Sequence, residues 1–352
     1  MGTWSKLAGL KLTIDSVELQ PRSLRVTPQF DRRTTVVRLG GAGVHGLGED
    51  VSYDDGDQER FQQATIAWPR GEFDLAGFST ALDGIELFGQ PPQLFAYHDY
   101  RRWAVEAAAL DLALRQSGRT LAAQLGRLPR PVRFVVSMGL GHSPTLDKVH
   151  GLIRRVPSTR FKLDANSEWS QDLLDEIAAL NAIDIVDFKG AYKGTPVDTV
   201  PDARLYRRVA ETLPQAILED PAWIAETAVA LEPYHERIAW DAAIHSVSDI
   251  EALPFQPRAM NLKPSRFGTL ERLCEAYDYC ARHRITTYGG GQFELDIGRH
   301  QIQTLASLFH SDGPNDVAPV AYHRPDEHPI LPASPLTPAR PGPESGFVES
   351  WS

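Results

Sequence analysis

The strongest constraint on the fold of this chain is a regular alternation of short apolar segments with longer amphipathic ones from Arg133 onward. The apolar segments have the length of strands, and the stretches between them have the length of helices. Strand starts recur about every 20 to 35 residues, which is the interval of a strand–helix unit. Seven such units followed by the helical pattern RHQIQTLASLF favour a (β/α) barrel over an open sheet. The expected strands are RFVVSMGL (133–140), RFKLDAN (160–166), IDIVDFKG (183–190), QAILEDP (215–221), RIAWDAA (237–243), AMNLKPS (259–265) and ITTYGGG (285–291).

The residues before the barrel follow a different pattern. KLTIDSVEL and TTVVRLGGAGVHGLGED, within residues 11–53, have strand character and predict a small antiparallel sheet. Helical patterns follow, the clearest being RRWAVEAAALDLALRQSG. A chain of 352 residues is long enough for a barrel and a smaller companion. We therefore expect an α+β domain over residues 1–126 and a modified TIM barrel over 127–310.

The last segment, residues 311–352, is rich in proline. It holds nine of the 26 prolines, so we expect an extended chain without regular structure. The sequence leaves two arrangements open, a loose tail or a strap packed on the N-terminal domain.

Composition excludes several classes of partner. No apolar run of about 18 residues and no secretory signal pattern occurs, which predicts a cytoplasmic protein without a membrane partner. The net charge of −10 and the lack of a basic block argue against nucleic acid. Cys274 and Cys280, six apart in a helical pattern, support neither a disulfide nor a zinc site. The oligomeric state stays open, a homo-oligomer included.

Charged residues cluster at the C-terminal ends of the predicted strands. Residues two apart on a strand share a face, so the charged residues turn inward while their apolar neighbours pack against helices. A solvated loop position explains any single strand-end charge, but TIM barrels keep their active sites at this end. Seven coincident cases therefore predict one site. Its members are Lys162, Asp164, Asp187, Lys189, Glu219, Asp241 and Lys263.

The lysines and the carboxylates suggest the chemistry of that site. The chain has only seven lysines, and four of them (Lys162, Lys189, Lys193 and Lys263) lie at or just past strand ends. Lysine, unlike arginine, can act as a base near neutral pH. Three carboxylates on consecutive strands would repel one another unless a cation neutralised them. Mg²⁺ is the expected cation, because no histidine cluster accompanies the carboxylates to favour zinc.

These residues resemble those of the enolase superfamily, in the branch of mandelate racemase and muconate-lactonizing enzyme. The resemblance runs from ILEDP (217–221) through WDAAIHSVSDIEAL and MNLKPSRFGTLERL to GGGQFELDIG (289–298). The TTVVRLGGAGVHGLGED and AAALDLAL segments are similar to the capping domain of that family.

The resemblance implies Mg²⁺ at Asp187, Glu219 and Asp241. It also implies that lysines on opposite sides of the barrel act as acid and base on a carbon next to a carboxylate. Catalytic roles then fall to Lys162, Lys263 and Asp164, and the substrate-binding positions are Lys189, Gly290 and Glu294.

The sequence departs from the family pattern on two strands. The usual Lys-x-Lys of the second strand reads Lys162-Leu163-Asp164, so either Lys162 serves alone or Asp164 acts as the base. LDANSEW (163–169) is similar to the third-strand metal motif, yet counting strands favours Asp187 over Asp164 as the first metal ligand. Lys189 then stands where the family often has asparagine.

The histidines near the predicted site and an acidic run in the N-terminal domain give further expectations about the chemistry and the ligand. GGGQFE lacks the histidine of the His–Asp racemases, which favours the lysine–lysine type, and His245 is expected to be a loop histidine. A glycine-rich loop near Gly46 precedes the acidic run from Glu49 to Asp55, at the place where the family's cap closes over substrate. Its acidity would disfavour a second anionic group on the ligand.

The resulting hypothesis is a Mg²⁺-dependent enzyme that abstracts a proton α to a carboxylate of a small molecule. Dehydration is favoured slightly over epimerisation and cycloisomerisation as the outcome. Two alternatives stay open: a catalytically silent barrel that binds an acid, and a Schiff-base aldolase that uses Lys263.

Overall fold

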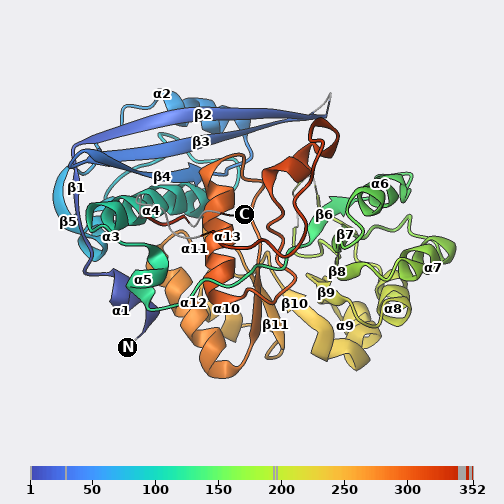
Figure 1. The fold of residues 1–352 in the computed structure, drawn as a ribbon. Helices are drawn as coiled ribbons and strands as arrows, with labels where there is room; N and C mark the ends of the chain where they lie inside the picture. The colour runs from blue at the N-terminus through green and yellow to red at the C-terminus, as the bar shows by residue number, and fades with distance from the viewer. Residues whose placement is uncertain are drawn as a thin grey trace.

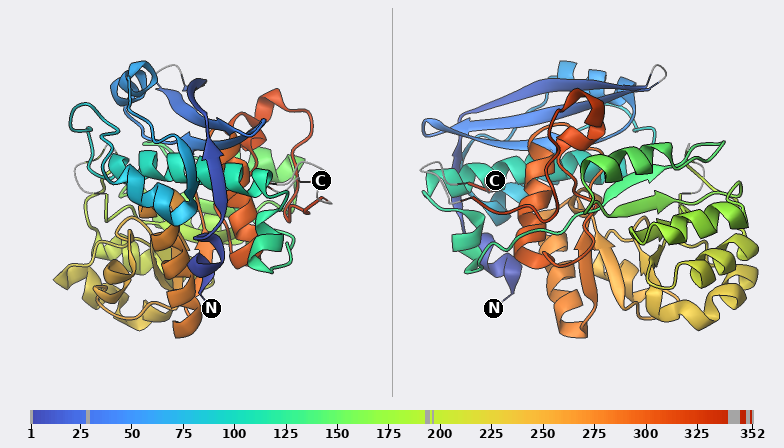
Figure 2. Two further views of the ribbon diagram at one scale, coloured as in Figure 1. Left: turned by 90° about the vertical axis from the view of Figure 1, so that its left-hand side faces the viewer. Right: turned by 45° about the vertical axis from the view of Figure 1, so that its right-hand side comes forward.

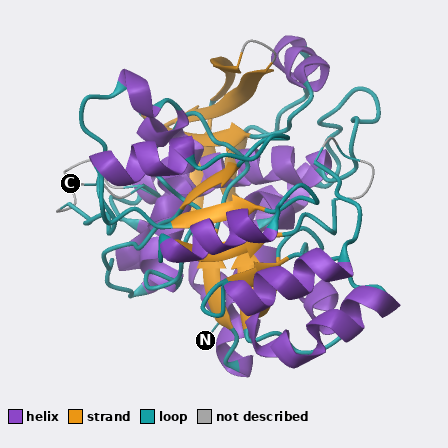
Figure 3. Cartoon of the chain, turned by 90° about the vertical axis from the view of Figure 1, so that its right-hand side faces the viewer, coloured by secondary structure: helices purple, strands orange, loops and turns teal. Residues whose placement is uncertain are grey.

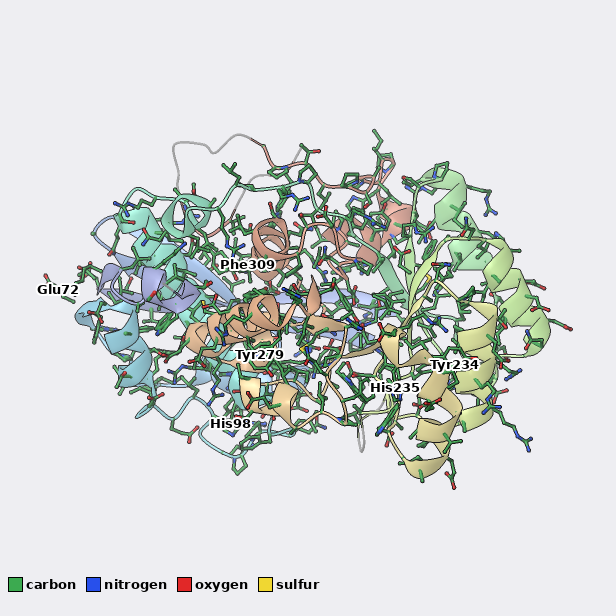
Figure 4. The ribbon with its side chains drawn as sticks, turned by 90° about the horizontal axis from the view of Figure 1, so that it is seen from below. Glu72, His98, Tyr234, His235, Tyr279 and Phe309 are labelled. Atoms are coloured by element: carbon green, nitrogen blue, oxygen red, sulfur yellow. The ribbon has the colours of Figure 1, made fainter. Side chains whose placement is uncertain are left out.

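The computed structural model describes residues 2–27, 30–192, 195, 197–339, 346–348 and 351. Figure 1 shows an antiparallel sheet lying over a long helix, with a curved parallel sheet and its helices beside and below them. In Figure 4, viewed from below, Glu72 marks the end of the molecule formed by the N-terminal half, while Tyr234 and His235 lie on the barrel half. Tyr279 and Phe309 lie between these ends, on two helices that connect the halves.

The N-terminal half is built on a three-stranded meander in the order β2-β3-β4. Its long helix α4 (Tyr97–Gln116) packs closely against β4 (Val44–Asp50). Glycine makes this approach possible, since a Cβ at Gly48 would lie 1.9 Å from the carbonyl oxygen of Ala104. The segment near Gly46, expected from the sequence to be a glycine-rich loop, is therefore part of β4 and provides the contact between strand and helix. The other elements of this half are α1 (Thr3–Leu7), β1 (Lys11–Ile14), β2 (Ser16–Thr27), β3 (Phe30–Gly41), α2 (Asp55–Gln63), β5 (Gly71–Asp74), α3 (Leu75–Leu82) and α5 (Leu121–Leu125).

The predicted strands of this half are divided more finely than expected. TTVVRLGGAGVHGLGED forms a hairpin, because Ala42 and Gly43 turn the chain with φ of 50° and 79°. KLTIDSVEL divides at Asp15 into β1, which pairs with β5, and the start of β2.

The barrel half is a parallel seven-stranded sheet in the order β12-β11-β10-β9-β8-β7-β6. All seven predicted strands are present, each shorter than its apolar segment. The sheet curls until Asn315 and Asp316 form parallel bridges to Phe134 on one side and Gly290 on the other. This confirms the expected modified TIM barrel with an α+β companion. The strands are β6 (Val136–Gly139), β7 (Phe161–Asp164), β8 (Ile183–Asp187), β9 (Ile217–Glu219), β10 (Ile238–Trp240), β11 (Ala259–Leu262) and β12 (Thr286–Gly289).

Helices cover the outer side of the curved sheet, as Figures 2 and 3 show. Alternation along the strands buries Phe161 and Leu163 of β7 against them, and turns Ile185 and Tyr288 into a small apolar cluster inside the barrel. The short helices α10 and α11 had no clear signal in the sequence. The helices are α6 (Asp147–Arg155), α7 (Gln171–Ala179), α8 (Ala203–Thr212), α9 (Ala225–Leu231), η1 (Glu232–Arg237), α10 (Val247–Glu251), α11 (Pro264–Phe267), α12 (Leu270–His283) and α13 (Ile297–Phe309).

The described part of the proline-rich segment lies against the rest of the chain. After the short turns η2 (Val320–His323) and η3 (Pro325–Glu327), Leu336 bridges Val132 at the start of the barrel. Farther on, Phe347 is buried and its ring meets Trp103 of α4 edge-on. Residues 340–345, 349–350 and 352 lie outside the described part of the chain. Within that part, no helix has both the length and the apolar character that crossing a membrane requires.

Candidate active site

Three carboxylates from consecutive strands meet at the C-terminal rim of the barrel. Asp187 ends β8, Glu219 ends β9 and Asp241 directly follows β10. Each offers an oxygen, and these oxygens lie within 4.8 Å of one another. Asp187 and Glu219 are register partners, and all three residues are 0% exposed. Inward alternation on adjacent parallel strands thus brings together the three acids that the sequence singled out.

Lys162 of β7 contacts two of these carboxylates. Its Nζ lies 3.0 Å from Asp187 Oδ2 and donates a short hydrogen bond to Glu219 Oε1. The other oxygen of Glu219 accepts a bond of 2.5 Å from the hydroxyl of Tyr288. The Lys162 side chain is only 1% exposed.

Asp241 is held by a different set of donors. Lys263 Nζ lies 2.8 Å from its Oδ2, and Tyr192 donates its hydroxyl to the same oxygen over 3.0 Å. Arg266 Nε lies 3.1 Å from Oδ1, and the guanidinium also bonds the Tyr192 hydroxyl at 2.9 Å. Lys263 comes directly after β11, so it reaches the site from the side opposite to β7.

Lys189 and Asp164 form a further pair at the same rim. Lys189 Nζ lies 2.5 Å from Asp187 Oδ2 and 3.3 Å from Asp164 Oδ1. Asp164 is the register partner of Asp187 but is absent from the group of three acids. The side chains of Asp164 and Lys189 are 34% and 15% exposed, against 5% or less for Lys162, Lys263 and the three acids. The site is therefore open to solvent mainly beside this pair.

Nearby cations lower the pKa values of the three acids, and burial raises them. Burial by itself would raise the pKa of Asp187, but Lys162 and Lys189 outweigh it and hold that pKa well below its usual range. Asp241 likewise has a lowered pKa because Arg266 and Lys263 outweigh burial. Burial dominates at Glu219 and raises its pKa despite Lys162. Two of the three acids are thus firmly ionised in this arrangement.

The three acids have the chemistry of a site for a hard divalent cation. Each ligand atom that the three acids offer is a carboxylate oxygen, the kind of ligand that Mg²⁺ prefers in proteins. Asp241 Oδ1 is buried and makes no hydrogen bond within the described chain, although Arg266 lies beside it. A cation at the trio would give this oxygen a partner and offset the repulsion among the acids.

The N-terminal half reaches the rim through a clasp made of Arg32 and Glu49, both buried. Arg32, on β3, donates to the carbonyl oxygens of Gln292 and Phe293, which follow β12. Glu49, on β4, accepts from Thr34 Oγ1 and from the backbone amides at the start of α13, with bonds of 2.7 to 3.0 Å. The same Arg32 guanidinium lies 4.1 Å from the centre of the Tyr53 ring.

The clasp overturns the expectation that the acidic run faces the ligand. Glu49 binds α13, and Asp50 is buried in an ion pair of 2.8 Å with Arg101. Asp54 caps α2 by accepting from the Asp57 amide. These three carboxylates are bound by groups of the protein itself. Their charge therefore gives no reason to exclude a second anionic group on the ligand.

The remaining predicted positions fall at or near the rim. Gly290 lies against Lys263: a Cβ at Gly290 would be 2.8 Å from Lys263 Cε. Glu294 is buried and pairs with Arg299 at 3.2 Å. His245 lies in the loop after β10, with Nδ1 2.9 Å from the carbonyl oxygen of Arg266. Lys193 is outside the described residues.

The sequence did not predict four further residues of the site, which are Tyr192, Tyr288, Arg32 and Arg266. Tyr288 lies two residues before Gly290 on β12 and could have been found by alternation. Arg266 stands three residues after Lys263, but only the short helix α11 turns it back to the site. Tyr192 and Arg32 carry no signal in their surroundings, because they reach the rim from a loop and from the other half of the chain.

Comparison with known protein families assigns the chain to one of them. Residues 5–124 match the family described as "Domain of unknown function (DUF8230) N-terminal domain", and residues 128–324 match its C-terminal domain. The chain belongs to the DUF8230 family.

Two curated relatives of this DUF8230 protein are enzymes. An N-succinylamino acid racemase of Amycolatopsis is 29% identical over 231 residues, covering 64% of the chain and 61% of the relative. An o-succinylbenzoate synthase of Geobacillus kaustophilus is 25% identical over 257 residues, covering 67% and 66%. The chain therefore matches less than two thirds of the length of these two relatives.

Solved structures share the fold of the DUF8230 protein. Muconate cycloisomerase from Pseudomonas fluorescens superposes with a TM-score of 0.66 at 17% identity, covering 97% of both chains. A dipeptide epimerase from Methylococcus capsulatus, in complex with Mg²⁺, gives a TM-score of 0.61 at 18% identity over 88% of this chain and 92% of its own. Together with the curated relatives, these matches place the chain in the enolase superfamily, in the mandelate racemase and muconate-lactonizing branch.

Proposed function

We propose that this DUF8230 protein uses Mg²⁺ to abstract a proton α to the carboxylate of a small molecule. The observation that carries the proposal is the convergence of Asp187, Glu219 and Asp241 at one rim with two lysines beside them. When bound by these acids, Mg²⁺ would supply positive charge to stabilise an enolate. The names of the relatives, which include racemase, synthase, cycloisomerase and epimerase enzymes, support this class of reaction.

Lys263 and the Lys189–Asp164 pair are the proposed proton-transfer groups. Lys263 reaches the rim from β11, where Gly290 leaves room for its side chain. Lys189 is the more exposed of the two lysines at the β7–β8 side, and Asp164 orients it. Lys162, first expected to be catalytic, is enclosed between two acids, so we propose that it holds them instead.

Elimination is the proposed outcome, with water as the leaving group. Lys263 and the Lys189–Asp164 pair differ in burial and in the groups that they contact. Such a difference suits a reaction in which one group removes a proton and the other donates a proton to a leaving hydroxyl. Epimerisation would instead require each of the two groups to act both as the base and as the acid.

Deuterium exchange tests the proposal. The protein would be incubated in D₂O and Mg²⁺ with a panel of acid sugars, N-acylated amino acids and dipeptides, and α-deuterium would be measured by mass spectrometry. We expect incorporation into at least one acid, lost with EDTA and in Glu219→Gln. No incorporation or turnover across the panel, from a protein shown to bind Mg²⁺, would favour a silent acid-binding barrel instead.

A Schiff-base aldolase using Lys263 is not favoured by any contact. Lys263 is paired with Asp241, and such a mechanism leaves the three adjacent acids without a role. Trapping of a substrate on Lys263 by borohydride in the presence of EDTA would support it.

The domain bounds and the cellular context of the protein are proposed as well. We propose domains over residues 1–126 and 127–310, and the family matches that end at 124 and begin at 128 support the boundary between them. We also propose that the described part of the C-terminal segment 311–352 acts as a strap. A cytoplasmic location and the lack of nucleic-acid or membrane partners stay predictions, and the oligomeric state stays open.

A further inference from the structure

We propose that Lys162 is a built-in counter-ion, which holds Asp187 and Glu219 together in the metal-free protein and competes with the divalent cation for them. The inference deepens the proposed function and rests on it, because it concerns the acids assigned there to the metal.

The contacts of the Lys162 ammonium carry this inference. Its Nζ is 3.0 Å from Asp187 Oδ2 and bonds Glu219 Oε1, so one ammonium bridges two acids on neighbouring strands. The three side chains are 1% exposed or less. Water therefore screens none of the charges involved, and each acts strongly on the others.

Charge balance gives the ammonium its first task. Asp187 and Glu219 are register partners, so their carboxylates lie side by side in a buried place. Without a cation they would repel one another and pay the cost of desolvation. Lys162 offsets both effects, and it thereby keeps the two acids in position before any metal arrives.

The same ammonium opposes metal binding. A divalent cation held by Asp187 and Glu219 would lie a few ångströms from a buried positive charge, and the repulsion between them weakens binding. Lys162 thus lowers the affinity for the metal, while it keeps the two acids in position in the metal-free protein. Lys189 also contacts Asp187 but not Glu219, and its side chain is more exposed, so its influence is smaller.

The test measures Mg²⁺ binding and thermal stability in the variants Lys162→Met and Lys162→Gln. Calorimetric titration with Mg²⁺ is expected to give a Kd at least about 10-fold lower than in the wild type, since a repelling charge is gone. In EDTA both variants are expected to melt at a lower temperature than the wild type. Saturating Mg²⁺ is expected to raise their melting temperature by more than it raises that of the wild type.

Two controls separate charge from packing. Tyr288→Phe removes a neutral donor from Glu219 and leaves Lys162 in place, so Mg²⁺ affinity is expected to stay the same or fall. Lys148→Met removes one charge from an exposed lysine on α6 and is expected to change neither quantity.

Each outcome decides for or against the counter-ion. Unchanged or weaker Mg²⁺ binding in both Lys162 variants would overturn it, provided that the wild type binds Mg²⁺. If the variants fold only when Mg²⁺ is present, the proposal is supported, because the metal then replaces the missing charge. If neither folds even in saturating Mg²⁺, the proposal fails. A wild type that binds no divalent cation would instead contradict the proposed function.

Discussion

Lys189, two residues past the end of β8, forms an ion pair of 3.3 Å with Asp164 at the end of β7. The family pattern places a lysine on the earlier strand, at the position of Asp164. In this chain the lysine follows the neighbouring strand β8, and an aspartate occupies the position on β7. Lys162 and Lys189 thus both place an ammonium at this side of the rim, and that of Lys189 is the more exposed.

Exchanging Lys189 and Asp164 tests whether the Lys189 ammonium takes part in proton transfer. Lys189→Met and Asp164→Asn are each expected to lower α-proton exchange, Lys189→Met by about 100-fold or more. The double variant Asp164→Lys, Lys189→Asp restores the pair with its charges exchanged and is expected to recover part of the loss. Exchange rates in the three proteins, followed by mass spectrometry, check this. A double variant no better than Lys189→Met would show that the position of the lysine, rather than the pair, is what matters.

Gly290 is expected to control the placement of Lys263. In Gly290→Ala the new Cβ would lie 2.8 Å from Lys263 Cε, so the lysine must shift. A displacement of this kind is expected to lower kcat by about 100-fold while KM changes less. Gly151→Ala on α6 is the matched control, because its Cβ would meet only the end of the Arg154 side chain at 3.9 Å. Steady-state kinetics check both, and an unaffected kcat in Gly290→Ala would count against Lys263 as a proton-transfer group.

Glu49 is expected to hold the two halves of the molecule together. Glu49→Gln has one acceptor oxygen in place of two, and its amide group would face backbone N–H donors, so stability should fall by about 3 kcal/mol. Urea unfolding measures this. Glu59→Gln is the control, since Glu59 makes an exposed pair with Arg33 and should matter little. Equal stability of the two variants would rule out the clasp.

His310 gives the fold a dependence on pH. Burial lowers the pKa of His310 to about 4, and its Nδ1 lies 2.6 Å from Oδ1 of Asn315, the residue that closes the barrel. The unfolded chain binds a proton near pH 6.5 and the folded chain only near 4, so this stability is complete above about 6.5 and is lost as pH falls toward 4. The loss should reach roughly 3 kcal/mol.

Urea unfolding between pH 7.5 and 4.5 checks this expectation. His310→Gln cannot titrate and should show a smaller fall in stability over that interval than the wild type. His323, which is partly buried, has a pKa lowered to about 3 and acts in the same direction in both proteins. Parallel curves for the two proteins would contradict the role given to His310.

Much of the barrel could be predicted because its signals are local. Five of the seven strands combine an apolar run with a charge at the C-terminal end, and alternation alone sends Asp187, Glu219 and Asp241 inward. The strand count also favoured Asp187 over Asp164, and the structure gathers Asp187 with the other two acids.

The other half of the site depends on contacts that no local pattern encodes. Arg32 reaches the rim across about 260 residues of sequence, as its bond to Gln292 shows. The acidic run after Gly48 was expected to face the ligand, because the groups that it contacts, α13 and Arg101, are far along the chain and give no local signal. The ion pair between Lys189 and Asp164 was missed for the same reason: each residue was assessed on its own strand, while the pair forms between strands.

Calorimetric titration of the wild-type protein with Mg²⁺ tests the central claim most directly. The account predicts one Mg²⁺ per chain, bound at Asp187, Glu219 and Asp241, and no binding after Glu219→Gln or Asp241→Asn. Uptake of no divalent cation by the folded wild-type protein, or binding that survives both substitutions, would contradict it.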